Sequence, residues 1–196
     1  MYQATLGAGT LTPDIRLAHT ALIYKTGKTL EDSAAYQPIS ILNIELKLLA
    51  RVFAARLYEV CDKLIHRDQH GFMLLHGTRH NLRCLCGIPT RKFSIGEPVV
   101  ILFLDAEKAS NSLEWPYLMV VLENMELSWI SLLYTAPIVK VWVNRTFLRE
   151  FWPVRGTRQW CPLSPLLFML AIKPLAEWAR KVALLQGIIG ILIEKM

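Results

Sequence analysis

The stretch that decides the fold of this chain reads Val99-Val100-Ile101-Leu102-Phe103-Leu104-Asp105. Six consecutive apolar residues, rich in β-branched and aromatic side chains, follow Gly96 and Pro98. Such a run predicts a strand that is buried on both faces of a sheet. The strand ends at Asp105, so the Asp105 carboxylate should lie at the edge of the sheet. A carboxylate at that position is a candidate catalytic group.

Helix and strand patterns alternate around this stretch and predict a mixed α/β (α+β) fold. Asn43 is a favourable N-cap, and apolar residues recur every three or four positions from Leu46 to Leu64. Lys47, Arg51 and Arg56 fall outside that stripe. We therefore expect a helix with one buried face and one basic face.

The remaining elements follow from the same patterns. The first 20 residues show no clear period and predict a loop with one short helix. A helical face from Leu113 to Met125 should lie against the sheet, and a further apolar helix ends at Pro137. Two strands joined at Asn144-Arg145, a long helix and a last strand complete the prediction. Their bounds are Ile138–Val143, Phe147–Val154, Pro162 or Ser164 to Arg180, and Gly187–Ile193.

The composition is that of a globular chain and fits a piece of something larger. It has 196 residues, of which 53% are hydrophobic and only 19% are charged. No uncharged run reaches the roughly 18 residues that cross a bilayer, so we expect no membrane partner. Asp14 and Arg16 stand where a secretory signal would be apolar. We expect an intracellular location, in the nucleus or the cytoplasm, where the four cysteines stay free thiols.

The positive charge of the chain is concentrated in one segment. The formal net charge is +6, and residues 47–92 hold nine Lys and Arg against three acidic residues. Basic and acidic residues balance elsewhere. A segment of this kind suits a partner that carries phosphates, although a solvated helix face would have the same composition.

Two shorter patterns allow more than one interpretation. Lys25-Thr26-Gly27-Lys28 predicts either an ordinary hairpin turn or a pair of lysines that hold phosphates. His76, His80, Cys84 and Cys86 have the side chains of a zinc site. Their spacing lacks the usual Cys-x2-4-Cys pair, so we do not assign zinc to them.

Four motifs in the order of the sequence carry a family resemblance. They are Tyr36–Ile41, Leu64–Phe72, Leu104–Ala109, and Gly156–Gln159 with Cys161–Pro165. Together they resemble the reverse transcriptase of LINE-type non-LTR retrotransposons, from about Ala21 to Arg180. The resemblance implies right-hand polymerase fingers and a partial palm, with an antiparallel palm sheet and packed helices.

The resemblance also implies a division of the chain and a set of partners. Residues 1–20 would be a poorly defined segment, 21–98 a fingers-like basic region, and 99–196 the partial palm. The partners would be an RNA template, an RNA/DNA hybrid and the rest of a longer retroelement polypeptide. In such enzymes two Mg²⁺ ions activate the primer hydroxyl and the incoming triphosphate. Asp105 matches the first metal-binding aspartate.

The rest of the metal site has no counterpart in this chain. The family's paired aspartates stand on a hairpin downstream of the helix that follows Ser164-Pro165, and the acids after that point are Glu177 and Glu194. One aspartate cannot complete the oxygen shells of two Mg²⁺ ions. We therefore expect a truncated, degenerate copy, with the catalytic hairpin missing and no polymerase activity.

Departures within the matched motifs favour the same conclusion. The family has a large aromatic residue at Ser110, which excludes a ribose hydroxyl, and an acid at Asn111. It has glycine at Trp160, which lets the backbone approach the nucleotide, and arginine at Gln37. An indole at position 160 is expected to crowd the pocket.

These assignments give two groups of candidate residues. The positions expected at a nucleotide are Lys25, Gln37, Ala106, Ser110, Gln159 and Trp160. The cations expected to meet nucleic-acid phosphates are Lys47, Arg51, Arg56, Arg79, Arg83 and Arg158. Two alternatives to a polymerase fragment stay open: a non-catalytic nucleic-acid-binding remnant, and a decayed fragment without a role of its own.

Overall fold

The computed structural model describes residues 9–66, 69, 71–73, 79, 82–83, 86–87, 109–158 and 160–181. The chain divides into two compact units. The first consists of Met1–Ala55 and Lys108–Ala171, and the second of Arg56–Glu107 and Ile172–Met196. The strand predicted over Val99–Asp105 and the one predicted over Gly187–Ile193 lie outside the described residues.

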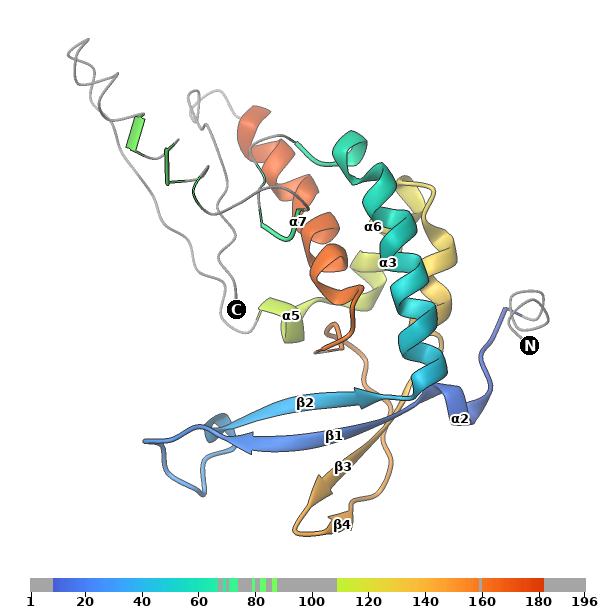
Figure 1. Ribbon diagram of the computed structural model, residues 1–196, viewed down its shortest axis with the longest axis vertical. Coiled ribbons are helices and arrows are strands. Elements are labelled where there is room, and N and C mark those ends of the chain that lie inside the picture. The colour runs from blue at the N-terminus through green and yellow to red at the C-terminus, as the bar shows by residue number, and fades with distance from the viewer. Residues whose placement is uncertain are drawn as a thin grey trace. The chain divides into compact units, whose positions relative to one another are not determined.

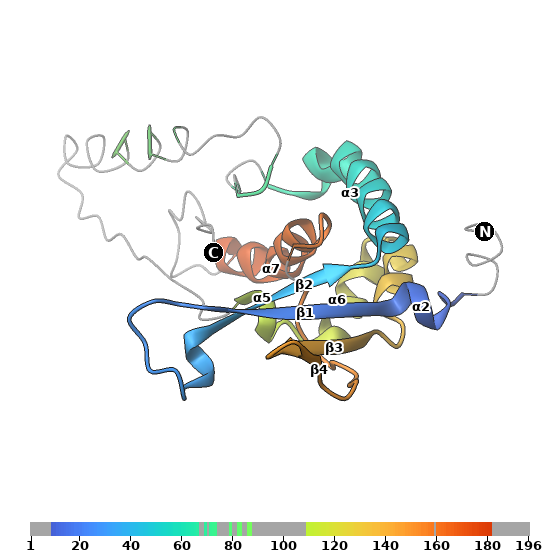
Figure 2. The ribbon, with the colours of Figure 1, turned by 60° about the horizontal axis from the view of Figure 1, so that its bottom comes forward.

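A four-stranded sheet in the order β2-β1-β3-β4 lies in the first unit (Figure 1). Its strands are β1 (Leu17–Tyr24), β2 (Tyr36–Leu42), β3 (Ile138–Val143) and β4 (Thr146–Phe147). β1 pairs antiparallel to β2 and parallel to β3, which Figure 2 shows on either side of it. The sheet is therefore mixed, and it takes strands from both predicted segments, 21–98 and 99–196. With the helices described below, it confirms the α/β class.

One face of this sheet is buried at the end where the strands meet the helices. Ala18, Thr20, Leu42 and Val139 are at most 8% exposed. The registers Ala18↔Leu42 and Ala18↔Val139 place three of them side by side. Alternation along a strand sends every second side chain to the same face. The burial of Ala18 and Thr20 therefore marks the core side of the sheet at this end.

The β3–β4 hairpin has the predicted turn but a shorter second strand. Asn144 and Arg145 have φ values of 49° and 64°, as the two central residues of a type I′ turn require. The strand expected over Phe147–Val154 is wrong in its extent, since β4 ends at Phe147. Trp142 pairs with Phe147 and Val139 with Phe151, so the second strand carries one extra residue. Such a bulge interrupts the ladder.

Short helices connect the strands of the first unit. They are α2 (Pro13–Arg16), η1 (Ser33–Ala35), α5 (Ala109–Ser112), α6 (Trp115–Asn124) and η2 (Ser128–Tyr134). The loop expected over residues 1–20 is wrong from Leu17 onwards, because Leu17–Thr20 pair with β2 or β3 as part of β1. The 3₁₀ helix η2 takes the place of the apolar helix predicted before Pro137. Among the described elements, α6 packs mainly on η2.

Helix α3 (Ile44–Leu64) confirms the helix predicted from the Asn43 cap and the apolar period. The Asn43 side chain accepts a hydrogen bond of 3.0 Å from the Glu45 N–H, which caps the first turn. The predicted stripe is buried from Leu46 to Leu57 and at Cys61, and Val60 is half-buried. The basic positions Lys47, Arg51 and Arg56 are exposed. In the first unit, Phe53 of this stripe packs edge-on against Trp129, with 4.6 Å between the ring centres.

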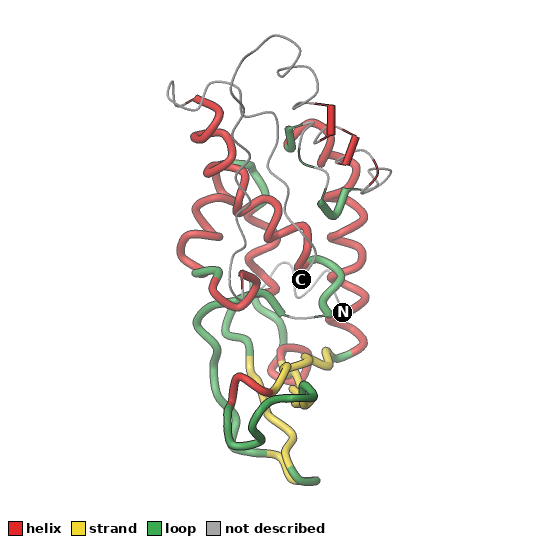
Figure 3. Tube along the Cα trace, turned by 90° about the vertical axis from the view of Figure 1, so that its left-hand side faces the viewer, coloured by secondary structure: helices red, strands yellow, loops and turns green. Residues whose placement is uncertain are grey.

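Helix α7 (Ser164–Lys181) begins at the predicted position and contains Pro174. Its first turns supply four fully buried side chains of the first unit, Leu166, Leu167, Met169 and Leu170, all at 0% exposure. Figure 3 separates these helical parts of the chain, in red, from the strands in yellow. None of the described helices is both long and apolar enough to span a membrane.

The second unit holds the C-terminal parts of α3 and α7. Near the end of α3, Cys61 is 1% exposed, and the Tyr58 hydroxyl donates a 3.3 Å hydrogen bond to the Phe72 carbonyl. On α7, Lys173 and Glu177 form an ion pair of 2.8 Å across one helical turn.

Candidate nucleotide and nucleic-acid site

The segment after Asp105 and the segment before α7 are tied together by backbone hydrogen bonds. The Thr157 N–H donates to the Ser110 carbonyl at 2.6 Å, and the Gly156 N–H donates to the Leu113 carbonyl at 2.7 Å. A β-bridge joins Glu114 to Arg155. Two motifs that are far apart in the sequence therefore lie side by side at α5.

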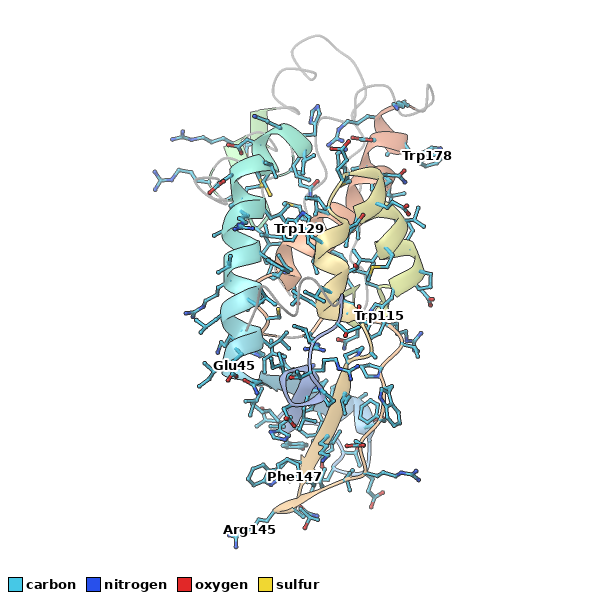
Figure 4. All side chains as sticks on the ribbon, turned by 90° about the vertical axis from the view of Figure 1, so that its right-hand side faces the viewer. Glu45, Trp115, Trp129, Arg145, Phe147 and Trp178 are labelled. Carbon is cyan, nitrogen blue, oxygen red and sulfur yellow. The ribbon has the colours of Figure 1, made fainter. Side chains whose placement is uncertain are left out.

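Gly156 is required where these two segments meet. Its φ is +86°, in the left-handed region that favours glycine. A Cβ atom there would lie 3.0 Å from the Asn111 carbonyl oxygen and 3.1 Å from the Asn111 Cα. The Trp115 indole N–H also donates to the Gly156 carbonyl at 2.8 Å, and Figure 4 shows Trp115 at this place. The close backbone contact between Gly156 and Asn111 and the hydrogen bond from Trp115 together hold residues 155–157 against α5.

Trp115 is the residue of this cluster that the sequence interpretation missed. Its indole and the Gly156 carbonyl belong to segments 41 residues apart. No periodicity or motif in the sequence connects the two positions. The available signal was a tryptophan in the first turn of a short helix, which ordinary packing explains equally well.

Trp160 has the backbone conformation that the expected glycine would adopt. Its φ is +65°, and its side chain is 70% exposed. Around it the chain turns into α7: the Ser164 hydroxyl donates to the Arg158 carbonyl at 2.7 Å, and the Cys161 N–H donates to the same oxygen at 3.1 Å. The turn therefore has the positive φ that favours glycine, and it carries an indole that is exposed to solvent.

Arg158 directs its guanidinium towards the interior of the first unit. Its Nε and Nη2 atoms are shielded from solvent and have no hydrogen-bond partner among the residues that the structure describes. Burial lowers the pKa of Arg158, and the nearby Tyr134 phenol and Cys161 thiol act in the opposite direction. Burial also raises the pKa of Tyr134. The assignment of Arg158 to nucleic-acid phosphates stays a prediction, and in this conformation the side chain is positioned for an interior role.

Lys25 and Gln37 lie at the far end of the β1–β2 hairpin, both exposed. Gln37 pairs in register with Ile23, and the Lys25 N–H donates to the Ala35 carbonyl at 2.7 Å. The Tyr24 hydroxyl donates to the Lys28 carbonyl and the Tyr36 hydroxyl to the Leu30 carbonyl, so this connection is an organised loop. Among the described residues, no hydrogen bond or ion pair links Lys25 or Gln37 to Ser110 or Trp160.

The solvent side of α3 carries the predicted cations together with an apolar stripe. Lys47 and Arg51 are exposed one turn apart in the first unit, and Arg56 is exposed further along the helix. Ile44, Leu48 and Val52, spaced four residues apart, form an apolar stripe beside Lys47 and Arg51. They are 73%, 52% and 48% exposed. The sequence predicted the basic residues and missed this exposed stripe.

Part of the predicted site lies outside the residues that the structure describes. Asp105, Ala106 and Gln159 lie outside the described residues, and so do His76, His80 and Cys84. Arg79 and Arg83 are exposed and helical. Within the ranges that the structure describes, no group of three or more His, Cys, Asp or Glu side chains could hold a metal ion.

A comparison with protein families identifies the class of protein that this geometry belongs to. Residues 23–191 match the profile of the family described as Reverse transcriptase (RNA-dependent DNA polymerase). The match includes the β1–β2 hairpin from Ile23 onwards, α5 and the turn into α7. The predicted resemblance is confirmed over most of the chain.

Three curated relatives are similar to the chain. One is the Retrovirus-related Pol polyprotein from type-1 retrotransposable element R2 of Nasonia vitripennis, 30% identical over 77% of this chain. The Transposon TX1 uncharacterized 149 kDa protein of Xenopus laevis is 28% identical over 88%. The RNA-directed DNA polymerase from mobile element jockey of Drosophila melanogaster is 31% identical over 61%. The chain spans only 13–15% of the length of these relatives.

Proposed function

The chain belongs to the reverse transcriptase (RNA-dependent DNA polymerase) family, as a domain of LINE-type retroelements, and we propose that this stretch adds no nucleotides by itself. Trp160 carries the proposal. It stands at the position where the resemblance has glycine, with an indole on a glycine-like backbone of φ +65°. A side chain at that point obstructs the approach of a nucleotide to the backbone.

The donor set of this stretch supports the same proposal. Reverse transcriptases in general depend on divalent metal ions, held by acidic oxygen ligands. After Ser164 the acids in this sequence are Glu177 and Glu194, and Glu177 pairs with Lys173 at 2.8 Å. The described residues therefore do not fit a two-metal site, and no catalytic step is assigned to them.

Primer extension tests the proposal directly. The chain should give no extension of a DNA primer on an RNA template with Mg²⁺ or Mn²⁺. A double variant with Ser110→Phe and Trp160→Gly should stay inactive, because it restores the pocket but not the carboxylates. Template-dependent product that disappears in Asp105→Ala would overturn the proposal.

A second function, nucleic-acid binding, is favoured by Lys47 and Arg51. Both are exposed on one side of α3, and neither forms an ion pair with a described residue. Two unpaired cations one helical turn apart can neutralise phosphates of an RNA/DNA hybrid and release its counterions. We propose that this pair contributes a sequence-independent contact to such a duplex within a longer retroelement polypeptide inside the cell.

The salt dependence of binding measures this contact. Each phosphate contact that is lost should reduce the slope of log K against log salt by about 1. Lys47→Ala with Arg51→Ala should therefore lower the slope by about 2 for a labelled hybrid duplex followed by fluorescence anisotropy.

The matched control is Lys181→Ala, which removes another exposed lysine, at the end of α7. Its slope should equal that of the unaltered chain. A slope that is the same for the double variant and the unaltered chain would contradict the proposed contact. Circular dichroism on each variant, with a cooperative thermal transition, establishes that the proteins compared are folded.

A further inference from the structure

Helix α3 is apolar on two opposite sides, and one of them is exposed. Leu46 and Phe53 lie on the buried side and are at most 4% exposed. Ile44, Leu48 and Val52 lie on the solvent side and are 48–73% exposed. We call these three residues the exposed stripe. A helix with apolar residues on opposite sides has the pattern of one that packs between two layers.

The exposed stripe has the spacing of a surface that packs against another helix. Its residues follow one another at intervals of four, and such positions share one face of an α-helix. From Ile44 to Val52 the stripe runs about 12 Å along α3, at 1.5 Å per residue. Side chains in such a row form a ridge that fits a groove on a second helix. Apolar side chains neutralise no phosphates, so the duplex proposed above does not account for them.

Positive charge borders the exposed stripe. Lys47 and Arg51 are exposed one helical turn apart and form no ion pair with a described residue. Glu45, labelled in Figure 4, is the acid of this part of the helix, and it is half-buried with an interaction of its own. An occupant of the stripe must therefore supply acidic side chains, because it would otherwise cover two unpaired cations at a high cost in desolvation.

A second copy of this chain does not supply the required charge. If two α3 helices pair antiparallel through the stripe about a two-fold axis, equivalent flanks of the two helices meet. Lys47 and Arg51 of one copy would then face the same cations of the other copy. In a parallel pair, the acid that meets these cations is Glu45, which already has an interaction. Charge complementarity therefore favours a different, acidic segment.

We propose that an acidic amphipathic helix from another part of the same retroelement polypeptide docks on the exposed stripe. Its apolar side chains pack on the stripe, and its carboxylates pair with Lys47 and Arg51. The relatives have ample chain for such a segment, because the matched stretch is only 13–15% of their length. A segment of the same polypeptide stays at high effective concentration, which keeps an apolar surface of this kind covered.

Docking at this face excludes the duplex contact proposed for Lys47 and Arg51. The two cations cannot pair with carboxylates and neutralise phosphates at the same time. The docked helix is therefore an internal competitor, which a hybrid duplex must displace before it reaches α3. This competition rests on the proposed duplex contact, whereas the docking itself rests on the exposed stripe and its charge.

A synthetic helix tests the docking on the full chain. The labelled peptide has about three heptads, with leucine at positions a and d and glutamate at e and g, and its binding is followed by anisotropy. Leu48→Gln with Val52→Gln should weaken binding about tenfold or more, as the loss of central apolar contacts does. Lys47→Ala with Arg51→Ala should also weaken it and reduce its salt dependence. A peptide with lysine in place of glutamate should not bind.

Leu175→Gln is the matched control, because it removes an apolar side chain of similar exposure, 57%, on α7. Its peptide affinity should equal that of the unaltered chain. The double glutamine variant should keep its affinity for the hybrid duplex, since the stripe makes no phosphate contact. The acidic peptide should displace the hybrid from the unaltered chain and not from this variant.

Zero-length carbodiimide cross-linking of the whole retroelement polypeptide identifies the occupant. Lys47 should join to an acidic residue of another segment of the same molecule, as a mixture of isotope-labelled and unlabelled copies reveals. Cross-links that run only between copies would overturn the proposal, and so would equal affinity for the lysine peptide. Binding of phosphatidylserine vesicles through the stripe, in place of the acidic peptide, would overturn it too. A salt slope for the hybrid that Lys47→Ala with Arg51→Ala leaves unchanged would contradict the duplex contact alone.

Discussion

At the scale of single residues, Trp160 combines a large side chain with a conformation that penalises it. A φ of +65° brings the Cβ atom of any L-residue close to backbone atoms, and only glycine avoids this contact. The indole gains little in return, because 70% of it is exposed. The residue therefore costs stability that no described contact offsets.

Trp160→Gly should consequently raise the free energy of unfolding by about 0.5–1 kcal/mol. The relief of strain exceeds the extra freedom that glycine gives to the unfolded chain. Urea unfolding followed by circular dichroism measures the change as a higher midpoint at an unchanged slope.

Trp152→Gly is the control for that substitution. Trp152 is 59% exposed and has no positive φ, so glycine there only adds freedom to the unfolded state. Its midpoint should fall. A midpoint that falls for Trp160→Gly as well would contradict the assignment of strain to position 160.

Arg158 shows what sequence cannot reveal about a single residue. The motif around it predicts a cation at a nucleic-acid site, yet its Nε and Nη2 atoms lie in the interior near Tyr134 and Cys161. The orientation of a long side chain depends on what surrounds it in the fold. Tyr134 belongs to η2, an element with no pattern that relates it to Arg158.

At the scale of elements, local signals predicted helices well and strand partners poorly. The Asn43 cap and the apolar period define α3, and the Pro-rich turn defines the start of α7, because both signals act within a few residues. The parallel pairing of Leu17–Ala21 with Ile138–Trp142 joins distant segments and leaves no local trace. The bulge before Phe151 likewise depends on the partner strand.

The candidate site divides in the same way. The resemblance implies that residues after Asp105 and residues of the turn before α7 meet one nucleotide, which stays a prediction. The hydrogen bonds of Thr157 and Gly156 show that the two segments lie side by side. The hydrogen bond from Trp115 to Gly156 and the ring contact between His19 and Phe147 required the fold, since both unite residues from distant segments. Asp105, from which the predicted fold was built, lies outside the described residues.

At the scale of the whole molecule, both units bury groups that ionise at alkaline pH. In the second unit, burial together with the charge of Asp62 raises the pKa of Cys61 to about 11, from 9.0. Burial raises the pKa of Tyr58 in the same unit and of Tyr117 and Tyr134 in the first. The native state of each unit therefore keeps protons that the unfolded chain releases.

The stability of the chain should fall as the pH rises from about 9 through 11. Between these values the unfolded Cys61 thiol loses its proton while the native one retains it, so ionisation favours unfolding. For Cys61 the loss is less than about 2.8 kcal/mol, since one pKa unit corresponds to about 1.4 kcal/mol and solvent screening reduces the effect. Urea midpoints measured across this range should decline continuously.

Cys61→Ala isolates the contribution of that thiol from those of the tyrosines. The variant is less stable at neutral pH because it leaves a small cavity at a position that is 1% exposed. Its midpoint should nevertheless decline less steeply between pH 9 and 11 than that of the unaltered chain, because one of the ionising groups is gone. Parallel declines in the two proteins would show that the Cys61 thiol ionises alike in the native and unfolded states, and the alkaline loss would then belong to the buried tyrosines.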